Sequence, residues 1–327
     1  MEINDRVYGL INIEEPIIID LINTRTMQRL KNIEQSGYQE PYFPGCTFKR
    51  FEHSVGVYWL LKLYGASLEE QIAGLIHDVS HAAFSHCVDY ALEGGDEKGQ
   101  SHQDNIHDDF VKNSDIAPVL EKYGFDLKFI LNDDNFPLKE NSLPDICADR
   151  IDYALRTACS YQKMTVEEAG YYLKNLLVKE KSWYFNSFEA AKRFAGLFEE
   201  LNKIYFAGLP SAIMHRTVGD YLKRALQQKY ITKQDLYMTD QEVLDKINMH
   251  LSDDAELRIC FDRMNNKIKT NNNPSDYDVH IFTKSRVIDP LFLDNGSLSR
   301  VSDRSSEWRM AVASNLLPKE YFLKFER

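Results

Sequence analysis

Apolar residues recur at helical spacing through most of the first 230 positions of this chain of 327 residues. Between residues 17 and 33 the pattern is interrupted near 24–26, so two successive helices are predicted there. Residues 188–202 and 212–228 repeat the same spacing, and each stretch is predicted to form a helix. The sequence therefore predicts a mainly α protein.

The stretch that begins at Ser67 is predicted to be a helix with polar residues at its end. Ser67 and Glu70 match the S-x-x-E capping box, in which two side chains satisfy free backbone N–H groups at a helix start. The apolar positions that follow lead to His77 and Asp78, so these two side chains are expected where the helix terminates.

A further helix is predicted from about Asp145 to Tyr161, and it carries a polar stripe. Four polar residues recur at i, i+4, i+7 and i+11, which places them on one face: Asp145, Asp149, Asp152 and Arg156. Asp152 either forms an exposed ion pair with Arg156 one turn later or supports a functional residue nearby.

The C-terminal part differs in character. Residues 270–278 contain three consecutive Asn and a Pro, which indicates a loop, and residues 279–287 alternate as a strand does. We therefore expect a main domain over residues 1–230 and a smaller mixed α/β region over residues 231–327.

Composition narrows the class of protein. The formal net charge of −11 argues against broad nucleic-acid binding, which needs clustered Lys and Arg, whereas a nucleotide-sized anion requires only a locally basic pocket. The first residues lack the features of a signal peptide, and no apolar stretch is long enough to cross a membrane. The five scattered cysteines contain no C-x-x-C pair, which is typical of reduced thiols. A cytoplasmic protein without membrane attachment is expected.

Six of the nine histidines lie between residues 53 and 107. A divalent metal that activates water binds neutral imidazole nitrogens and carboxylate oxygens while leaving positions open for substrate. Two histidines and two aspartates can supply such a set: His53, His77, Asp78 and Asp149. An isolated His-Asp pair is more often a helix cap or part of a core, so the surrounding residues decide between the two interpretations.

Three motifs in order along the chain resemble those of HD-domain phosphohydrolases. Residues 50–57 read R-F-E-H-S-V-G-V, residues 76–86 read I-H-D-V-S-H-A-A-F-S-H, and residues 148–153 read A-D-R-I-D-Y. Within this superfamily the chain is most similar to the deoxynucleoside triphosphate (dNTP) triphosphohydrolases, whose opening helices resemble residues 7–13 and 27–35.

The resemblance implies a helical HD-domain fold for the main domain and a metal bound by the four residues named above. It implies that His81 lies beside the scissile phosphate and that Asp89 orients His102 as a proton donor. It also implies a set of substrate-binding residues: Gln35, Arg50, His86, Arg150 and Tyr153. The ordinary alternatives are a structural His81 and a solvated His102, and His107 is expected at the surface.

Four positions differ from that branch. Ser211 stands where a phosphate-binding Arg is expected, and Thr157 stands where an Asp would contact the sugar hydroxyl. Asn23 and Lys31 replace an Asp and an Arg associated with a guanine-nucleotide activator, so turnover without an activator is expected.

The reaction expected first is hydrolysis of a dNTP to a deoxynucleoside and triphosphate. The cofactor is expected to be a divalent metal: manganese, iron, nickel, cobalt or magnesium. Alternative substrates are a nucleoside monophosphate, a cyclic nucleotide or a signalling nucleotide. The alternative outside enzymes is a nucleotide-sensing module without turnover, against which the complete set of metal ligands and candidate acids argues. A homo-oligomer is also expected.

Overall fold

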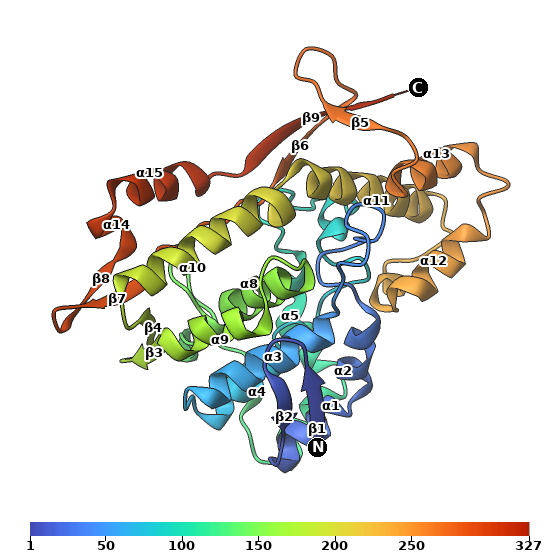
Figure 1. The fold of residues 1–327 in the computed structure, drawn as a ribbon. Helices are drawn as coiled ribbons and strands as arrows, with labels where there is room; N and C mark the ends of the chain where they lie inside the picture. Colours follow the sequence, from blue (N-terminus) through green and yellow to red (C-terminus); the bar gives the residue numbers. More distant parts are fainter. Residues whose placement is uncertain (327) are drawn as a thin grey trace.

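The centre of the fold is formed by two helices that lie against one another, α3 (Arg50–Leu63) and α8 (Ala148–Ser160) (Figure 1). The computed structural model describes residues 1–326. Gly56 of α3 faces α8 so closely that a Cβ atom there would lie 2.0 Å from Asp152 Oδ1 and 2.3 Å from Arg156 Nη2. The helices can approach this closely because residue 56 has no side chain.

Helices make up most of the chain, which confirms the predicted mainly α fold. The remaining α-helices before residue 230 are α1 (Pro16–Ile22), α2 (Arg25–Arg29), α4 (Leu68–Ile76), α5 (His102–Lys112), α6 (Ile116–Lys122), α7 (Leu127–Ile130), α9 (Val166–Asn175), α10 (Phe188–Leu201) and α11 (Leu209–Gln227). Later helices are α12 (Asp240–Asn248), α13 (Ala255–Met264), α14 (Val301–Arg304) and α15 (Ser306–Asn315). Short 3₁₀ or π segments are η1 (Leu30–Asn32), η2 (Ser85–Tyr90), η3 (Asp133–Asn135), η4 (Asn202–Phe206) and η5 (Gln234–Tyr237).

Three small sheets lie around these helices. The N-terminal hairpin pairs β1 (Glu2–Asp5) with β2 (Gly9–Asn12). A four-stranded sheet has the order β3 (Leu176–Lys179), β4 (Ser182–Phe185), β7 (Leu291–Asp294) and β8 (Ser297–Arg300), with β4 and β7 parallel. A three-stranded antiparallel sheet has the order β5 (Thr270–Asn272), β9 (Lys319–Phe325) and β6 (Val279–Thr283).

Local signals in the sequence locate several element ends. Ser67 caps α4 as predicted, because its hydroxyl accepts a hydrogen bond from the Glu70 backbone N–H at 3.2 Å. The Glu70 side chain does not complete the predicted capping box, because its carboxylate accepts the backbone N–H groups of Leu138 and Lys139 at 2.8 and 3.0 Å. The helix predicted from about residue 145 begins at Ala148, whose N–H donates to the Leu138 carbonyl at 2.8 Å. The strand predicted over residues 279–287 ends at Thr283, because its partner β9 begins opposite that residue.

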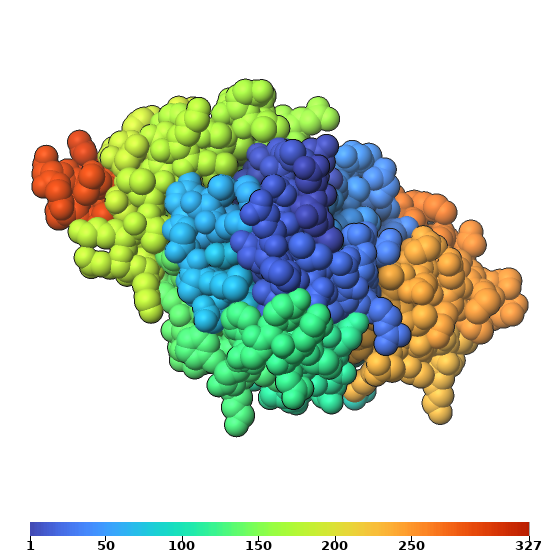
Figure 2. All heavy atoms as spheres, turned by 90° about the horizontal axis from the view of Figure 1, so that it is seen from below, coloured from blue at the N-terminus to red at the C-terminus, as the bar shows by residue number. Residues whose placement is uncertain are grey.

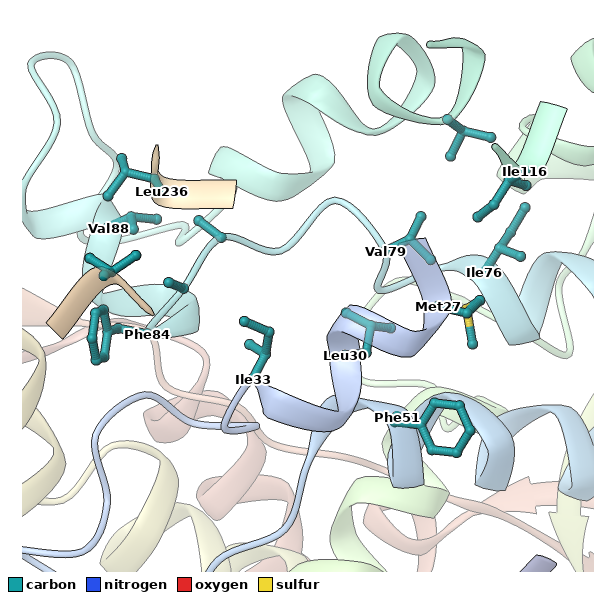
Figure 3. Close-up of a cluster of buried hydrophobic side chains, with 14 of the residues drawn as sticks. Met27, Leu30, Ile33, Phe51, Ile76, Val79, Phe84, Val88, Ile116 and Leu236 are labelled. Carbon is teal, nitrogen blue, oxygen red and sulfur yellow. The ribbon is translucent and has the colours of Figure 1, made fainter. Parts of the chain in front are cut away.

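Two clusters of buried side chains hold these elements together. Figure 3 shows part of the first cluster, in which Met27 lies between Phe51 of α3 and Ile76 at the end of α4. The second cluster surrounds α8 and α10 and includes Phe198. Removal of this apolar surface from water supplies the main stabilisation of the fold.

The C-terminal residues enter both clusters. Leu236 belongs to the first, and Phe292 and Trp308 belong to the second. Figures 1 and 2 show the α12–α13 segment and the β7–β8 hairpin at opposite ends of the molecule. Within residues 1–326 these segments pack onto the helical body from two sides, and a domain boundary at residue 230 stays a prediction. No helix among these residues combines the length and apolarity needed to cross a bilayer.

The close approach of α3 and α8 leads to a prediction about stability. Gly56→Ala should lower the free energy of unfolding by about 1–3 kcal/mol, because the added methyl group collides with Asp152 and Arg156. Gly170→Ala is the matched control, since this glycine of α9 has open space around its Cβ position. The control should be neutral or stabilise by up to about 1 kcal/mol. Denaturant unfolding of both variants checks this, and equal effects would contradict the packing described.

Candidate metal centre and cavity

His53 of α3 is held by two carboxylates of α8. Its Nε2 atom lies 2.8 Å from Asp149 Oδ1, and its Nδ1 atom lies 2.7 Å from Asp152 Oδ2. The two aspartates are three residues apart, so they occupy adjacent positions on one face of the helix. The imidazole is fully buried, and the contacts at both ring nitrogens fix its orientation.

His77 brings a second imidazole to the same point. It is the C-cap residue of α4, and its Nδ1 atom lies 2.7 Å from the Gly74 carbonyl oxygen. Its Nε2 atom is 3.2 Å from His53 Nε2 and 3.4 Å from Asp149 Oδ1. Ligand atoms of His53, His77 and Asp149 all lie within 4.8 Å of one another.

The tautomers favour a cation between these atoms. A carbonyl or carboxylate at each Nδ1 requires that nitrogen to donate, so each Nε2 atom of a neutral ring presents a lone pair. The Nε2 atoms of His53 and His77 and the Asp149 oxygen then point lone pairs at one another. This arrangement is repulsive unless a positive charge lies between them. The donor chemistry therefore fits a divalent metal, and the outer contacts at Nδ1 are of the kind that orients metal-bound histidines.

Asp78 faces the same group of atoms. Its oxygens lie 3.5 Å from His77 Nε2 and 3.8 Å from His53 Nε2. Arg50 holds this carboxylate by a 2.6 Å hydrogen bond from Nη1, and the same guanidinium donates to Ser85 Oγ at 2.8 Å. Burial opposes ionisation of Asp78, but the Arg50 charge and the nearby histidines hold its pKa well below its usual range.

The pKa values describe a site that stabilises positive charge. Burial acts against protonation of His53, but hydrogen bonds to Asp149 and Asp152 raise its pKa to about 10. Burial likewise acts against protonation of His77, and the charges of Asp78 and Asp149 raise its pKa. The carboxylates that favour a proton on these rings would equally favour a metal ion.

Asp152 belongs to a buried network and not to the exposed ion pair that was one interpretation of the sequence. Arg156 donates to both of its oxygens at 2.9 and 3.0 Å, and Tyr8 donates to Oδ1 at 2.9 Å. Arg156 also pairs with Asp5 at 2.9 Å. Asp152 and Arg156 are both fully buried, so this network fixes the carboxylate that orients His53.

A cavity of about 770 Å³ opens beside the cluster. Most of the predicted site residues line it: Gln35, Arg50, His77, Asp78, His81, His86, Asp149, Arg150 and Tyr153. His53 lies behind this wall with no exposed surface. The structure therefore brings together residues that are as far apart in sequence as Gln35 and Tyr153.

Several polar atoms on the cavity wall lack a hydrogen-bond partner within residues 1–326: Gln35 Oε1, His86 Nδ1, Tyr153 Oη and His215 Nδ1. Buried polar groups are almost always satisfied in proteins, so each exception requires an explanation. Four such groups on one wall are consistent with a polar ligand that completes their hydrogen bonds.

His102 is not among the residues that line the cavity, and Asp89 contacts its backbone where the sequence predicted a contact with its ring. His102 begins α5, and its Nε2 atom lies 3.0 Å from the Tyr237 hydroxyl. Asp89 Oδ1 accepts the backbone N–H of His102 at 3.1 Å, so the carboxylate caps the helix and does not contact the ring. The other oxygen of Asp89 faces His86 Nδ1 at 3.8 Å.

Comparison with known proteins agrees with this geometry. The profile of the HD domain matches residues 50–154. The chain is 35% identical over 297 residues to the uncharacterized protein YdhJ of Bacillus subtilis, with 90% of each chain covered. The chain belongs to the HD-domain family. The predicted membership of the HD-domain superfamily is thereby confirmed.

More distant relatives share part of this HD-domain chain. The metal-dependent phosphohydrolase cns2 of Cordyceps militaris is 38% identical over 51% of this chain and 48% of its own length. The deoxynucleoside triphosphate triphosphohydrolase SAMHD1 of Homo sapiens is 34% identical over 37% of this chain and 22% of its own length. A phosphohydrolase crystal structure from Bacteroides thetaiotaomicron has a TM-score of 0.75 at 18% identity and covers 100% of both chains, so it shares the fold.

A second group of possible donors lies beside the first. Atoms of Glu140, Cys147 and Asp149 lie within 4.8 Å of one another. Arg150 occupies this group, because its Nη2 atom is 2.9 Å from Glu140 Oε1 and its Nη1 atom is 3.1 Å from Cys147 Sγ. Burial raises the pKa of the Cys147 thiol well above its ordinary value, which disfavours the thiolate that binds metals.

Sequence reasoning missed several residues of the HD-domain cavity. His107, expected at the surface, lines the cavity with Nδ1 3.2 Å from Ser80 Oγ, and burial lowers its pKa to about 4. Lys139, Lys284 and Arg286 also line it. None of these three belongs to a recognisable motif, and the last two lie beyond the residues that the HD-domain profile matches.

The Asp152 network leads to a prediction about metal affinity. Asp152→Asn should weaken metal binding by about 10-fold to 100-fold, because His53 loses the carboxylate that orients it and favours positive charge on it. Asp262→Asn is the matched control, since Asp262 also interacts with an arginine four residues away, Arg258, but far from the cluster. Competition with a chromophoric chelator measures both affinities. Unchanged affinity in the Asp152 variant would contradict the assignment of His53 as a ligand.

Proposed function

We propose that this HD-domain phosphohydrolase cleaves a nucleotide at a divalent metal bound by His53, His77, Asp78 and Asp149. The observation that carries the proposal is the convergence of imidazole nitrogens and a carboxylate within 4.8 Å at the wall of a cavity of about 770 Å³. A cavity of this volume is large enough for a nucleotide. The unsatisfied polar atoms of the same wall supply candidate contacts to it.

A metal bound there would polarise a phosphoryl oxygen and lower the pKa of a water molecule. The protein's own residues have distinct roles. Arg50 fixes Asp78 and contributes positive charge to the cavity wall. Tyr153 and Gln35 line the cavity, and Tyr153 Oη and Gln35 Oε1 have no hydrogen-bond partner within residues 1–326, so we assign these two residues to sugar or phosphate recognition.

Proton delivery is assigned to His81 or His86. His81 Nε2 lies 3.2 Å from Asp78 Oδ1, and burial together with Arg50 lowers its pKa to about 3. Burial also lowers the pKa of His86 well below its ordinary value, so both rings are neutral in the free protein at pH 7. A bound phosphate brings negative charge to these rings and raises their pKa values.

We favour His86 as the acid and Asp89 as its positioning residue. His86 lines the cavity, and a movement of less than about 1 Å would bring its unsatisfied Nδ1 atom, now 3.8 Å from Asp89 Oδ2, into hydrogen-bond range. Burial raises the pKa of Asp89 to about 7. The negative charge of this carboxylate would favour a protonated His86.

The first choice of reaction is release of triphosphate from a dNTP, supported by the partial similarity to the triphosphohydrolases. The alternatives are a nucleoside monophosphate, a cyclic nucleotide or a signalling nucleotide, and a nucleotide-sensing module that does not turn over. Asn23 and Lys31 are exposed and replace the residues expected to bind an activator, so one nucleotide should suffice.

A screen of single nucleotides with manganese added, in which the products are resolved, tests the proposal. We expect a dNTP to yield a deoxynucleoside and triphosphate without a second nucleotide. Release of orthophosphate or pyrophosphate would identify one of the alternative substrate classes. Absence of turnover with every nucleotide by a protein that holds metal would contradict the proposal and favour a sensing module.

The proton-transfer assignment predicts a pattern across three variants. His86→Ala should lower kcat by about 10²-fold to 10⁴-fold, as expected for loss of a positioned acid. Asp89→Asn should lower it less, and the double variant should be less than additive because the two residues act together. His102→Ala is the control, because its ring contacts Tyr237. Metal content should be unchanged in all of them, and a larger loss in His102→Ala than in His86→Ala would reverse the assignment.

A further inference from the structure

Two cations from the C-terminal part of the chain reach the cavity. Lys284 and Arg286 follow β6 and line the wall beside the candidate metal centre. The residues between and beside them, Thr283, Ser285 and Val287, are buried, with exposed fractions of 0%, 4% and 1%. This alternation is that of an extended segment, so both basic side chains point to the same side.

The segment is anchored by a buried asparagine. Asn202, at the junction of α10 and η4, has no exposed surface. Its Oδ1 atom accepts the backbone N–H of Arg286 at 2.9 Å, and its Nδ2 atom donates to Ser285 Oγ at 3.0 Å. Further along, the Asp289 N–H donates to the Pro144 carbonyl at 2.7 Å. The positions of Lys284 and Arg286 are therefore built into the fold.

The other cations of the cavity wall are already engaged. Arg50 is paired with Asp78 at 2.6 Å, and Arg150 is paired with Glu140 at 2.9 Å. Lys139 is paired with Asp133. Within residues 1–326, neither Lys284 nor Arg286 forms an ion pair or a side-chain hydrogen bond, so these are the two cations of the wall that remain available to an anion.

Arg286 also affects Lys284. Burial and the positive charge of Arg286 together lower the pKa of Lys284 to about 8, while Asp104 and Glu140 compensate only in part. Burial raises the pKa of Tyr153, and the positive charge of Arg286 acts in the opposite direction. Arg286 therefore lies near the Tyr153 hydroxyl, which has no hydrogen-bond partner within residues 1–326. Two partly desolvated cations side by side are costly unless a ligand of opposite charge binds.

We propose that Lys284 and Arg286 bind phosphoryl groups beyond the one at the metal centre, so that the substrate carries at least two phosphoryl groups in a row. This inference rests on the proposed function, which places one phosphoryl group at the metal. A guanidinium offers several donors to phosphate oxygens, and an ammonium adds a point charge. A nucleoside monophosphate or a cyclic nucleotide leaves both cations without a partner.

Calorimetric titration of the metal-loaded full chain tests this, with inorganic tripolyphosphate and orthophosphate as probes and magnesium in excess. Lys284→Gln and Arg286→Gln should each weaken tripolyphosphate binding by about 10-fold to 100-fold, as expected for loss of a charged hydrogen bond. The affinity for orthophosphate should change less than about twofold, because a single phosphate binds at the metal centre and does not need Lys284 or Arg286. Lys269→Gln is the matched control, since Lys269 lies in the same C-terminal part and is exposed.

Two outcomes would overturn the inference. If both variants bind tripolyphosphate as tightly as the unmodified chain does, Lys284 and Arg286 do not contact it. If both variants lose as much affinity for orthophosphate as for tripolyphosphate, the two cations bind the phosphoryl group at the metal and not a further one. Arg286→Lys guards against a folding defect, because it retains the charge and should recover part of the affinity. Tripolyphosphate binding that depends on these residues, in a chain that hydrolyses no nucleotide, would contradict the proposed function alone.

Discussion

The buried contact between His53 and two aspartates of α8 is the interaction on which the rest of the site depends. One imidazole joins the two central helices, with Asp149 at Nε2 and Asp152 at Nδ1, at 2.8 and 2.7 Å. Burial of three ionisable groups is costly unless each is hydrogen-bonded and the charges balance. Arg156 pairs with both Asp152 and Asp5, whereas Asp149 brings its negative charge to the wall of the cavity.

This charge distribution is compatible with the proposed binding of an anion by a protein with a net charge of −11. Asp78 and Asp149 bring negative charge to the candidate metal centre, and a divalent ion there would offset it locally. Lys284 and Arg286 then add positive charge on the wall beside that centre. Their segment packs through Asn202 onto the helical body, so the C-terminal part of the chain contributes to the same cavity as the HD motifs.

The sequence predicted those parts of the site that depend on local signals. The Ser67 cap fixed the helix whose end carries His77, and the motif residues His53 and Asp149 meet as their residue types suggest. Contacts of residues outside the motifs, or of side chains whose partners are set by the fold, were not predictable in this way. Asp89 contacts the backbone of His102 and not its ring, because the start of α5 needs a hydrogen-bond acceptor there. Lys284 and Arg286 carry no motif, and only the fold brings them to the cavity.

We propose that a divalent metal binds between His53, His77, Asp78 and Asp149 and not at the adjacent Glu140–Cys147–Asp149 group. X-ray absorption spectroscopy of the metal-loaded protein distinguishes the two sites. We predict nitrogen and oxygen ligands only, with outer-shell scattering from two imidazoles. A sulfur ligand at about 2.3 Å, the distance typical of a metal thiolate, would place the ion at Cys147 and contradict the account.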